Sequence, residues 1–192
     1  LSHLRWEELE LWKQAWAHLE ASRRRQIMSR LVELTEDNFE LDFESIFRHC
    51  LKDEDAEVRG KAIEGLWESE DASLINPLIH LLEQDSSVAV QVAAAIALGK
   101  FALLAELNKL RSEYIPRLSQ ALLGVVNDNY RDMEVRRRAL EAVAPLSLPQ
   151  VESAIREAYH SHSHKLKVSA IYAMGRNCNR SWLPRAQASI ML

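Results

Sequence analysis

A short motif recurs four times along the chain and constrains its fold more than any other feature. Each copy has an apolar residue followed by a basic or amide residue, then an alanine four positions after the apolar residue and another apolar residue four positions later. The copies begin at Val58, Val90, Val135 and Leu166 and place their alanines at Ala62, Ala94, Ala139 and Ala170. Successive alanines are 32, 45 and 31 residues apart, which is the period of helical repeat proteins whose units pack only on their neighbours. The motif therefore predicts an all-α, α-α superhelix.

Each copy of the motif is predicted to form one helix of a two-helix unit. Its apolar residues and alanine are spaced by about one helical turn, so they share one buried face. Acidic or hydroxyl residues precede these helices and can accept hydrogen bonds from the N–H groups of the first turn: Asp53, Asp55, Asp85, Ser87, Asp132, Ser161 and Ser163. Several of the second helices begin with an apolar residue and a proline, at Ile115-Pro116, Leu148-Pro149 and Leu183-Pro184, with Pro77 close behind Ile75. The chain is therefore expected to alternate helix, turn and helix.

The organisation of the chain follows from where the motif is present. Residues 1–42 lack it but keep helical spacing, and we predict that they form an N-terminal helical hairpin that caps the array. Residues 43–192 are predicted to form about four repeats and an incomplete last unit as one continuous solenoid. The repeat between Ala94 and Ala139 is 13 residues longer than the one before it. Its extra residues, near Leu103 to Arg111 and Asn127 to Asp132, are expected to extend helices or form loops.

Composition narrows the class of protein. Of the 192 residues, 47% are hydrophobic and 27% charged, with five glycines and five prolines, which favours helices over disorder or a turn-rich β fold. The formal charge of −4 argues against a general nucleic-acid binder. We expect a cytoplasmic protein without membrane contact, since no run approaches about 18 apolar residues.

Cys50 and Cys178 are expected to be small buried residues without a disulfide between them. Because Leu1 replaces an initiator Met and a new unit begins at Leu183, the natural protein is expected to be longer.

The segment Asp53 to Arg59, followed by Ala62 and Leu66, resembles the HEAT repeat. The period of 31 to 32 residues resembles the subtype first associated with bilin lyases, and the resemblance covers roughly residues 43–192. It implies an α-solenoid in which the helices that begin at Val58, Val90, Val135 and Leu166 line the concave side. The chain has Gln91 and Lys167 where the family usually has arginine in an Asp–Arg ladder between successive turns.

A candidate binding groove follows from helical geometry. The residues three, six and ten positions after the first motif residue are expected to point away from the core, at about 100° per residue. They include Ala93 and Ser169, and the candidate partner-binding residues among them are Lys61, Glu64, Glu68, Ile96, Lys100, Arg138, Glu141, Tyr172 and Arg176. These residues predict a mixed-charge groove for a protein or peptide. The alternative is an ordinary solvated face.

Two further features have alternative interpretations. Trp67 stands where other repeats have Gly99, Ala144 and Gly175, and we favour the view that it fills space against the N-terminal hairpin over an exposed binding anchor. The run Arg23, Arg24 and Arg25 opposes the helix dipole of a predicted first turn. It is expected to pair with Glu8, Glu10 or Glu20 rather than to form a basic patch for a partner.

A metal site at His160, His162 and His164 is also considered. Imidazoles are common ligands of zinc, but no carboxylate or cysteine completes the set nearby, so a solvated turn between helices is favoured and no metal is expected. HEAT-fold metal hydroxylases resemble this architecture and carry His-Glu dipeptides, whereas none of the seven histidines here is followed by glutamate.

Sequence motifs for catalysis are lacking: the chain has no Gly-x-Ser-x-Gly, no phosphate-binding glycine loop, no His-Glu-x-x-His and no cysteine pair at ligand spacing. We therefore expect a non-enzymatic scaffold or regulator that needs no cofactor and binds a protein or peptide on its concave face. Two alternatives remain. One is a bilin-lyase-like role on tetrapyrrole-bearing proteins, implied by the resemblance alone. The other is nucleic-acid or damaged-base binding, known for some HEAT-like folds, against which Glu64, Glu68 and Glu141 argue.

Overall fold

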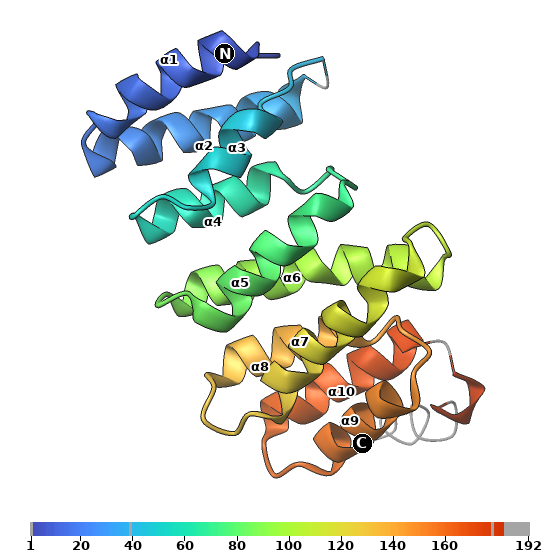
Figure 1. Ribbon diagram of the computed structural model, residues 1–192. Helices are drawn as coiled ribbons and strands as arrows, with labels where there is room; N and C mark the ends of the chain where they lie inside the picture. The colour runs from blue at the N-terminus through green and yellow to red at the C-terminus, as the bar shows by residue number, and fades with distance from the viewer. Residues whose placement is uncertain (1, 39, 178, 183–192) are drawn as a thin grey trace. The chain divides into compact units, whose positions relative to one another are not determined.

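The computed structural model (Figure 1) describes residues 2–38, 40–177 and 179–182. In these residues the regular secondary structure is helical, without β-strands, as the motif predicts. Contacts divide the chain into two compact units, residues 1–70 and 71–192, each with its own core. The predicted boundary at residue 42 and the continuity of one solenoid over 43–192 stay predictions.

The described part of the first unit forms four α-helices: α1 (Trp6–Ala17), α2 (Ala21–Asp37), α3 (Glu44–Cys50) and α4 (Ala56–Gly65). Helix α4 carries the first motif and packs against both α2 and α3, burying Val58 and Ala62 completely. Helix α1 buries only Trp16, whose indole Nε1 donates a hydrogen bond to Asp53 Oδ2 at 2.8 Å. The side chain of Cys50 is buried in this core, and burial raises the pKa of its thiol to about 12. Cys178 lies outside the described residues.

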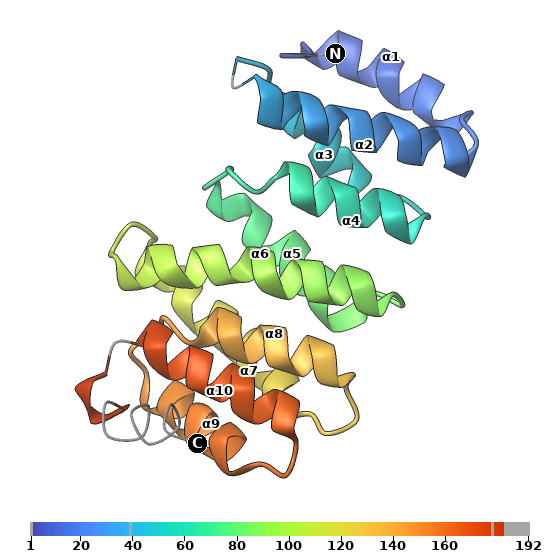
Figure 2. The same cartoon turned by 180° about the vertical axis from the view of Figure 1, so that it is seen from behind.

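The described residues of the second unit form six α-helices in two layers. Helices α5 (Ile75–Gln84), α7 (Ile115–Asn127) and α9 (Pro149–His160) form one layer, and α6 (Val88–Glu106), α8 (Met133–Val143) and α10 (His164–Asn177) form the other. Short 3-10 helices precede α5 and α7 at Ala72–Leu74 and Ser112–Tyr114, and another follows α10 at Arg180–Trp182. Figure 1 shows the first layer in front and Figure 2 shows the second. The predicted two-helix units are therefore confirmed, with the motif on α4, α6, α8 and α10.

Helix ends match the predicted signals in most repeats. Asp55 caps α4 by accepting hydrogen bonds from the N–H groups of Glu57 and Val58, and Asp132 caps α8 through the N–H of Glu134. Pro149 is the first residue of α9 and Pro116 the second of α7, where proline removes no helical hydrogen bond. Leu183-Pro184 lies outside the described residues.

In α4, α6 and α8 the side chain at the second motif position donates a hydrogen bond to a backbone carbonyl of the segment before the helix. Arg59 Nη1 donates hydrogen bonds to the carbonyl oxygens of Asp53 and Glu54, at 2.7 and 2.9 Å. In the next repeats Gln91 Nε2 donates to the carbonyl of Asp85, and Arg136 Nε donates to the carbonyl of Val126. An amide and a guanidinium can both donate such a bond, which explains why the position accepts either residue.

The sequence led us to expect no segment that approaches the length of a membrane span, and helix α6 shows that this expectation is wrong. By length and composition, this one helix among the described residues could cross a bilayer. A little over half of it is buried inside the unit, against α5, α7 and α8, so packing within the protein accounts for its apolar residues. The helix continues to Glu106, which places part of the predicted excess of the longer repeat in an extended helix.

The helices α6 and α8 approach closely because both have small residues at their contact. A Cβ atom added to Gly99 would lie 3.1 Å from Ala142 Cα and 3.3 Å from its Cβ. Further along the array, Asn177 Nδ2 donates hydrogen bonds to the carbonyls of Ala144 and Leu146. Its Oδ1 accepts one from the buried indole of Trp182. These contacts tie the end of α10 to the segment that follows α8.

Candidate protein-binding face

Six of the nine predicted groove residues lie on one layer of the second unit. We call them the α6–α8–α10 face: Ile96, Lys100, Arg138, Glu141, Tyr172 and Arg176. Ile96, Glu141 and Tyr172 occupy the same motif position, six residues after the first apolar residue, in three consecutive repeats. Because α8 packs between α6 and α10 (Figure 2), equivalent positions of the three helices form a row across this layer.

The two ends of this row are apolar and accessible. Ile96 is 42% exposed and Tyr172 is 51% exposed. Arg176 lies one turn beyond Tyr172, where its Nη1 donates a hydrogen bond to the phenolic oxygen at 3.2 Å and its guanidinium carbon lies 5.9 Å from the ring centroid. The tyrosine is therefore held by a neighbour of its own helix while its ring stays open to solvent.

The middle of the row is polar, and its charges are paired. Arg138 donates to Glu134 at 3.1 Å and to Glu141 at 2.9 Å. Arg137 Nε donates to the hydroxyl of Ser169, which in turn donates to Glu141 Oε1 at 2.6 Å. Ser169 is fully buried between α8 and α10, so the prediction that it points away from the core is wrong. Glu141 is accordingly a link between two helices and adds little free charge to the face.

The other three predicted groove residues belong to the first unit. Lys61 and Glu64 form an ion pair of 2.7 Å on the surface of α4, and Glu68 is exposed in the turn after that helix. The structure brings these three together on α4 and its following turn. It describes the two units separately, so one groove shared by all nine residues stays a prediction.

Val168 is a residue of the face that sequence reasoning missed. It is exposed and lies one helical turn before Tyr172, so Val168, Tyr172 and Arg176 form a stripe along α10. The four-residue spacing of the three side chains could have revealed this stripe. Counting outward from the motif at three, six and ten residues skipped the position.

The alternatives for Trp67 and the arginine run are also decided. Trp67 is 58% exposed, so the expectation that it fills space against the N-terminal hairpin is wrong.

Arg24 pairs with Glu54 and lies 3.6 Å from Asp53, and Arg25 pairs with Asp55 at 2.6 Å. Arg24 and Arg25 therefore do pair within the protein, but with acids of the loop before α4 and not with Glu8, Glu10 or Glu20, while Arg23 donates a hydrogen bond to Gln26.

The three neighbouring histidines lie at the turn between α9 and α10. His160 ends α9, His162 lies in the turn and His164 begins α10, and all three are exposed. Within the part of the chain that the structure describes, no three histidine, cysteine or carboxylate side chains gather at metal-binding distances. The solvated turn favoured from the sequence is the arrangement observed.

Comparison with known proteins supports the repeat assignment. Residues 45–131 match the family model for HEAT repeats, and this segment runs from α3 to the loop after α7. No curated protein matches the chain. The match is to HEAT repeats in general, so the likeness to the bilin-lyase subtype stays a prediction. The chain therefore contains HEAT repeats, matched over residues 45–131.

Proposed function

We propose that the protein is a non-enzymatic scaffold or regulator that binds a protein or peptide on the α6–α8–α10 face. HEAT repeats commonly serve as scaffolds for protein interaction. The observation that carries the proposal is the exposure of Ile96 and Tyr172 at equivalent positions of two repeats, on either side of Arg138, whose charge is paired with Glu134 and Glu141.

The chemistry of the face favours a protein partner. Tyrosine and arginine are frequent energetic anchors of protein interfaces, and apolar contacts supply most of the gain when water is excluded around them. Arg138 is already neutralised by Glu134 and Glu141, so the middle of the face offers no free positive charge from this residue to a phosphate backbone. A partner segment with apolar side chains is the occupant that these residues fit best.

The proposal is tested by affinity capture from a lysate of the source organism with wild-type protein and with the double variant Ile96→Ser, Tyr172→Ser. Truncation of interface anchors costs about 2 kcal/mol or more, roughly a 30-fold loss of affinity, so partners of the wild type should be lost. Tyr130→Ser is the matched control, because Tyr130 is fully exposed in the loop between α7 and α8.

Circular dichroism should be unchanged in both variants, since neither removes a buried side chain. Partners retained by the folded double variant would show that binding takes place elsewhere. Loss of the same partners in Tyr130→Ser would count equally against this face.

A further inference from the structure

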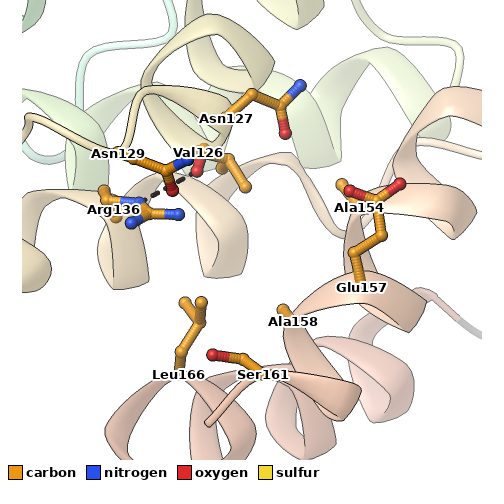
Figure 3. Close-up of a pocket in the computed structure, with 9 residues that line it drawn as sticks. All are labelled: Val126, Asn127, Asn129, Arg136, Ala154, Glu157, Ala158, Ser161 and Leu166. Carbon is orange, nitrogen blue, oxygen red and sulfur yellow. Dashed lines mark hydrogen bonds between the residues drawn. The ribbon is translucent and has the colours of Figure 1, made fainter. Parts of the chain in front are cut away.

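A pocket of about 300 Å³ lies in the second unit, apart from the α6–α8–α10 face (Figure 3). It opens between the loop that joins α7 to α8 and the turn that joins α9 to α10. Its polar side chains are Asn127, Asn129, Arg136, Glu157 and Ser161, and Leu166 with Ala158 forms part of an apolar floor. Figure 3 shows Arg136 and Glu157 on opposite sides of the cavity.

The guanidinium of Arg136 is held in place but not neutralised. Its Nε donates to the carbonyl of Val126 at 3.0 Å, which leaves the two Nη atoms for other partners. The next two arginines of α8 are paired with Glu134 and Glu141. For Arg136, in contrast, no carboxylate of the described residues lies within ion-pair distance.

Glu157 supplies a negative charge on the opposite wall of the pocket. Its Oε1 accepts a hydrogen bond from Ser153 Oγ at 3.0 Å, and no cation of residues 2–38, 40–177 or 179–182 lies within ion-pair distance of it. The pocket thus has one positive and one negative group, too far apart to pair with each other, and neither has a counter-charge among the residues that the structure describes.

The longer repeat supplies part of this pocket. Residues 128–132 connect α7 to α8, whereas only residues 85–87 connect α5 to α6 and residues 161–163 connect α9 to α10. Asn129 lies in that longer connection and Asn127 ends the helix before it. The Asn129 amide adds a donor and an acceptor beside Arg136, whereas residues 85–87 and 161–163 contain no amide side chain.

We propose that this pocket binds a free α-amino acid with an uncharged side chain. The carboxylate of the ligand accepts hydrogen bonds from the Nη atoms of Arg136, a pairing that guanidinium geometry favours. The ammonium group of the ligand faces Glu157, and its side chain lies over Leu166 and Ala158. Both charges of the pocket are then used, so a charged side chain on the ligand would have no partner. The volume is at the lower end of the range for small-molecule sites.

The ligand's two charges are tested by titrating the full chain with leucine, N-acetylleucine and leucinamide, with binding followed by calorimetry. Leucine should bind saturably. The acetylated compound lacks the ammonium group and leucinamide lacks the carboxylate, so each should bind at least about 10-fold more weakly, as expected for the loss of one charged hydrogen-bonding pair.

The pocket's two charges are tested by Arg136→Gln and Glu157→Gln. Gln91 holds the same motif position in another repeat and donates to a carbonyl before its helix, so the position accepts glutamine, and Arg136→Gln removes the charge. Both variants should weaken leucine binding by about 10-fold or more and leave the unfolding temperature near that of wild type. Arg117→Gln, which removes an exposed cation of α7 outside this pocket, is the control and should bind leucine normally.

Absence of saturable binding of leucine and of alanine up to about 10 mM would overturn the proposal, since weaker binding contributes too little free energy for a specific site. Leucine binding by Arg136→Gln equal to that of wild type would overturn it as well. Neither outcome bears on partner binding by the α6–α8–α10 face, because the pocket variants leave that face unchanged.

Discussion

The loop before α4 shows how single side chains in this protein serve both a helix and its neighbours. Asp55 accepts hydrogen bonds from two N–H groups at the start of α4 and from Arg25 of α2. A side chain with both tasks stabilises the helix end and the packing of α2 against α4 together. The cap was predicted from the sequence because it is local, whereas the partner arginine lies 30 residues away and could not be.

Acid should destabilise the first unit through Asp55. Hydrogen bonds from Arg25, with help from the N–H groups of Val58 and Glu57, lower the pKa of Asp55 from 3.8 to about 2. A carboxyl whose pKa is lower in the folded state stabilises that state above its ordinary pKa, and this contribution is lost as the pH falls from about 4 to about 2. Because Arg25 is partly exposed, we expect a contribution of about 1–2 kcal/mol at neutral pH.

Urea unfolding of wild type and Asp55→Asn at neutral pH and at about pH 3 measures this contribution. The variant should be less stable at neutral pH and should lose less stability on acidification. Asp37→Asn, which changes an exposed carboxylate at the end of α2, should keep the wild-type acid dependence. An acid dependence of Asp55→Asn equal to that of wild type would contradict the assignment.

At the scale of the helices, two helices approach closely where a residue with little or no side chain lies at their contact. The contact of α6 with α8 places Gly99 against Ala142, and the backbone of a packed helix has little freedom to retreat. The sequence indicated a small residue at this motif position in three of four repeats, but only the packing of α6 on α8 shows which atoms it meets.

Gly99→Ala should therefore destabilise the protein although alanine favours helices. We expect a net loss of about 1–2 kcal/mol, since overpacking outweighs the gain in helix propensity. Gly124→Ala in α7 is the matched control: nothing lies within 4 Å of its added Cβ, and it should gain about 0.5–1 kcal/mol. Both values follow from urea unfolding curves, and equal stability of the two variants would show that α6 and α8 can separate at small cost.

At the scale of the whole chain, each unit encloses a core of its own. In residues 71–192 the buried residues come from both layers, for example Ile79 of α5, Leu98 of α6 and Leu122 of α7. Since the stability of a repeat array is a sum of terms between neighbours, a segment of several repeats can fold without the rest.

A fragment of residues 71–192 should accordingly be helical and unfold cooperatively on heating, as followed by circular dichroism. Leu98→Asp in the same fragment should abolish the transition, because it places a charge at a fully buried position. A fragment with the spectrum of an unfolded chain would show that the second unit depends on residues 1–70.

The sequence by itself determined the helical repeats, since the spacing of apolar residues, alanines, caps and prolines is a local property that the physics of single helices can interpret. It also located the exposed residues Ile96 and Tyr172 from their register alone. Only the tertiary structure decided which charges are neutralised: it pairs Arg138 with Glu141, buries Ser169, and leaves Arg136 and Glu157 facing each other across a pocket. These relations join residues that are distant in sequence, and whether a charged group is paired or left open depends on which helices the folded chain places beside it.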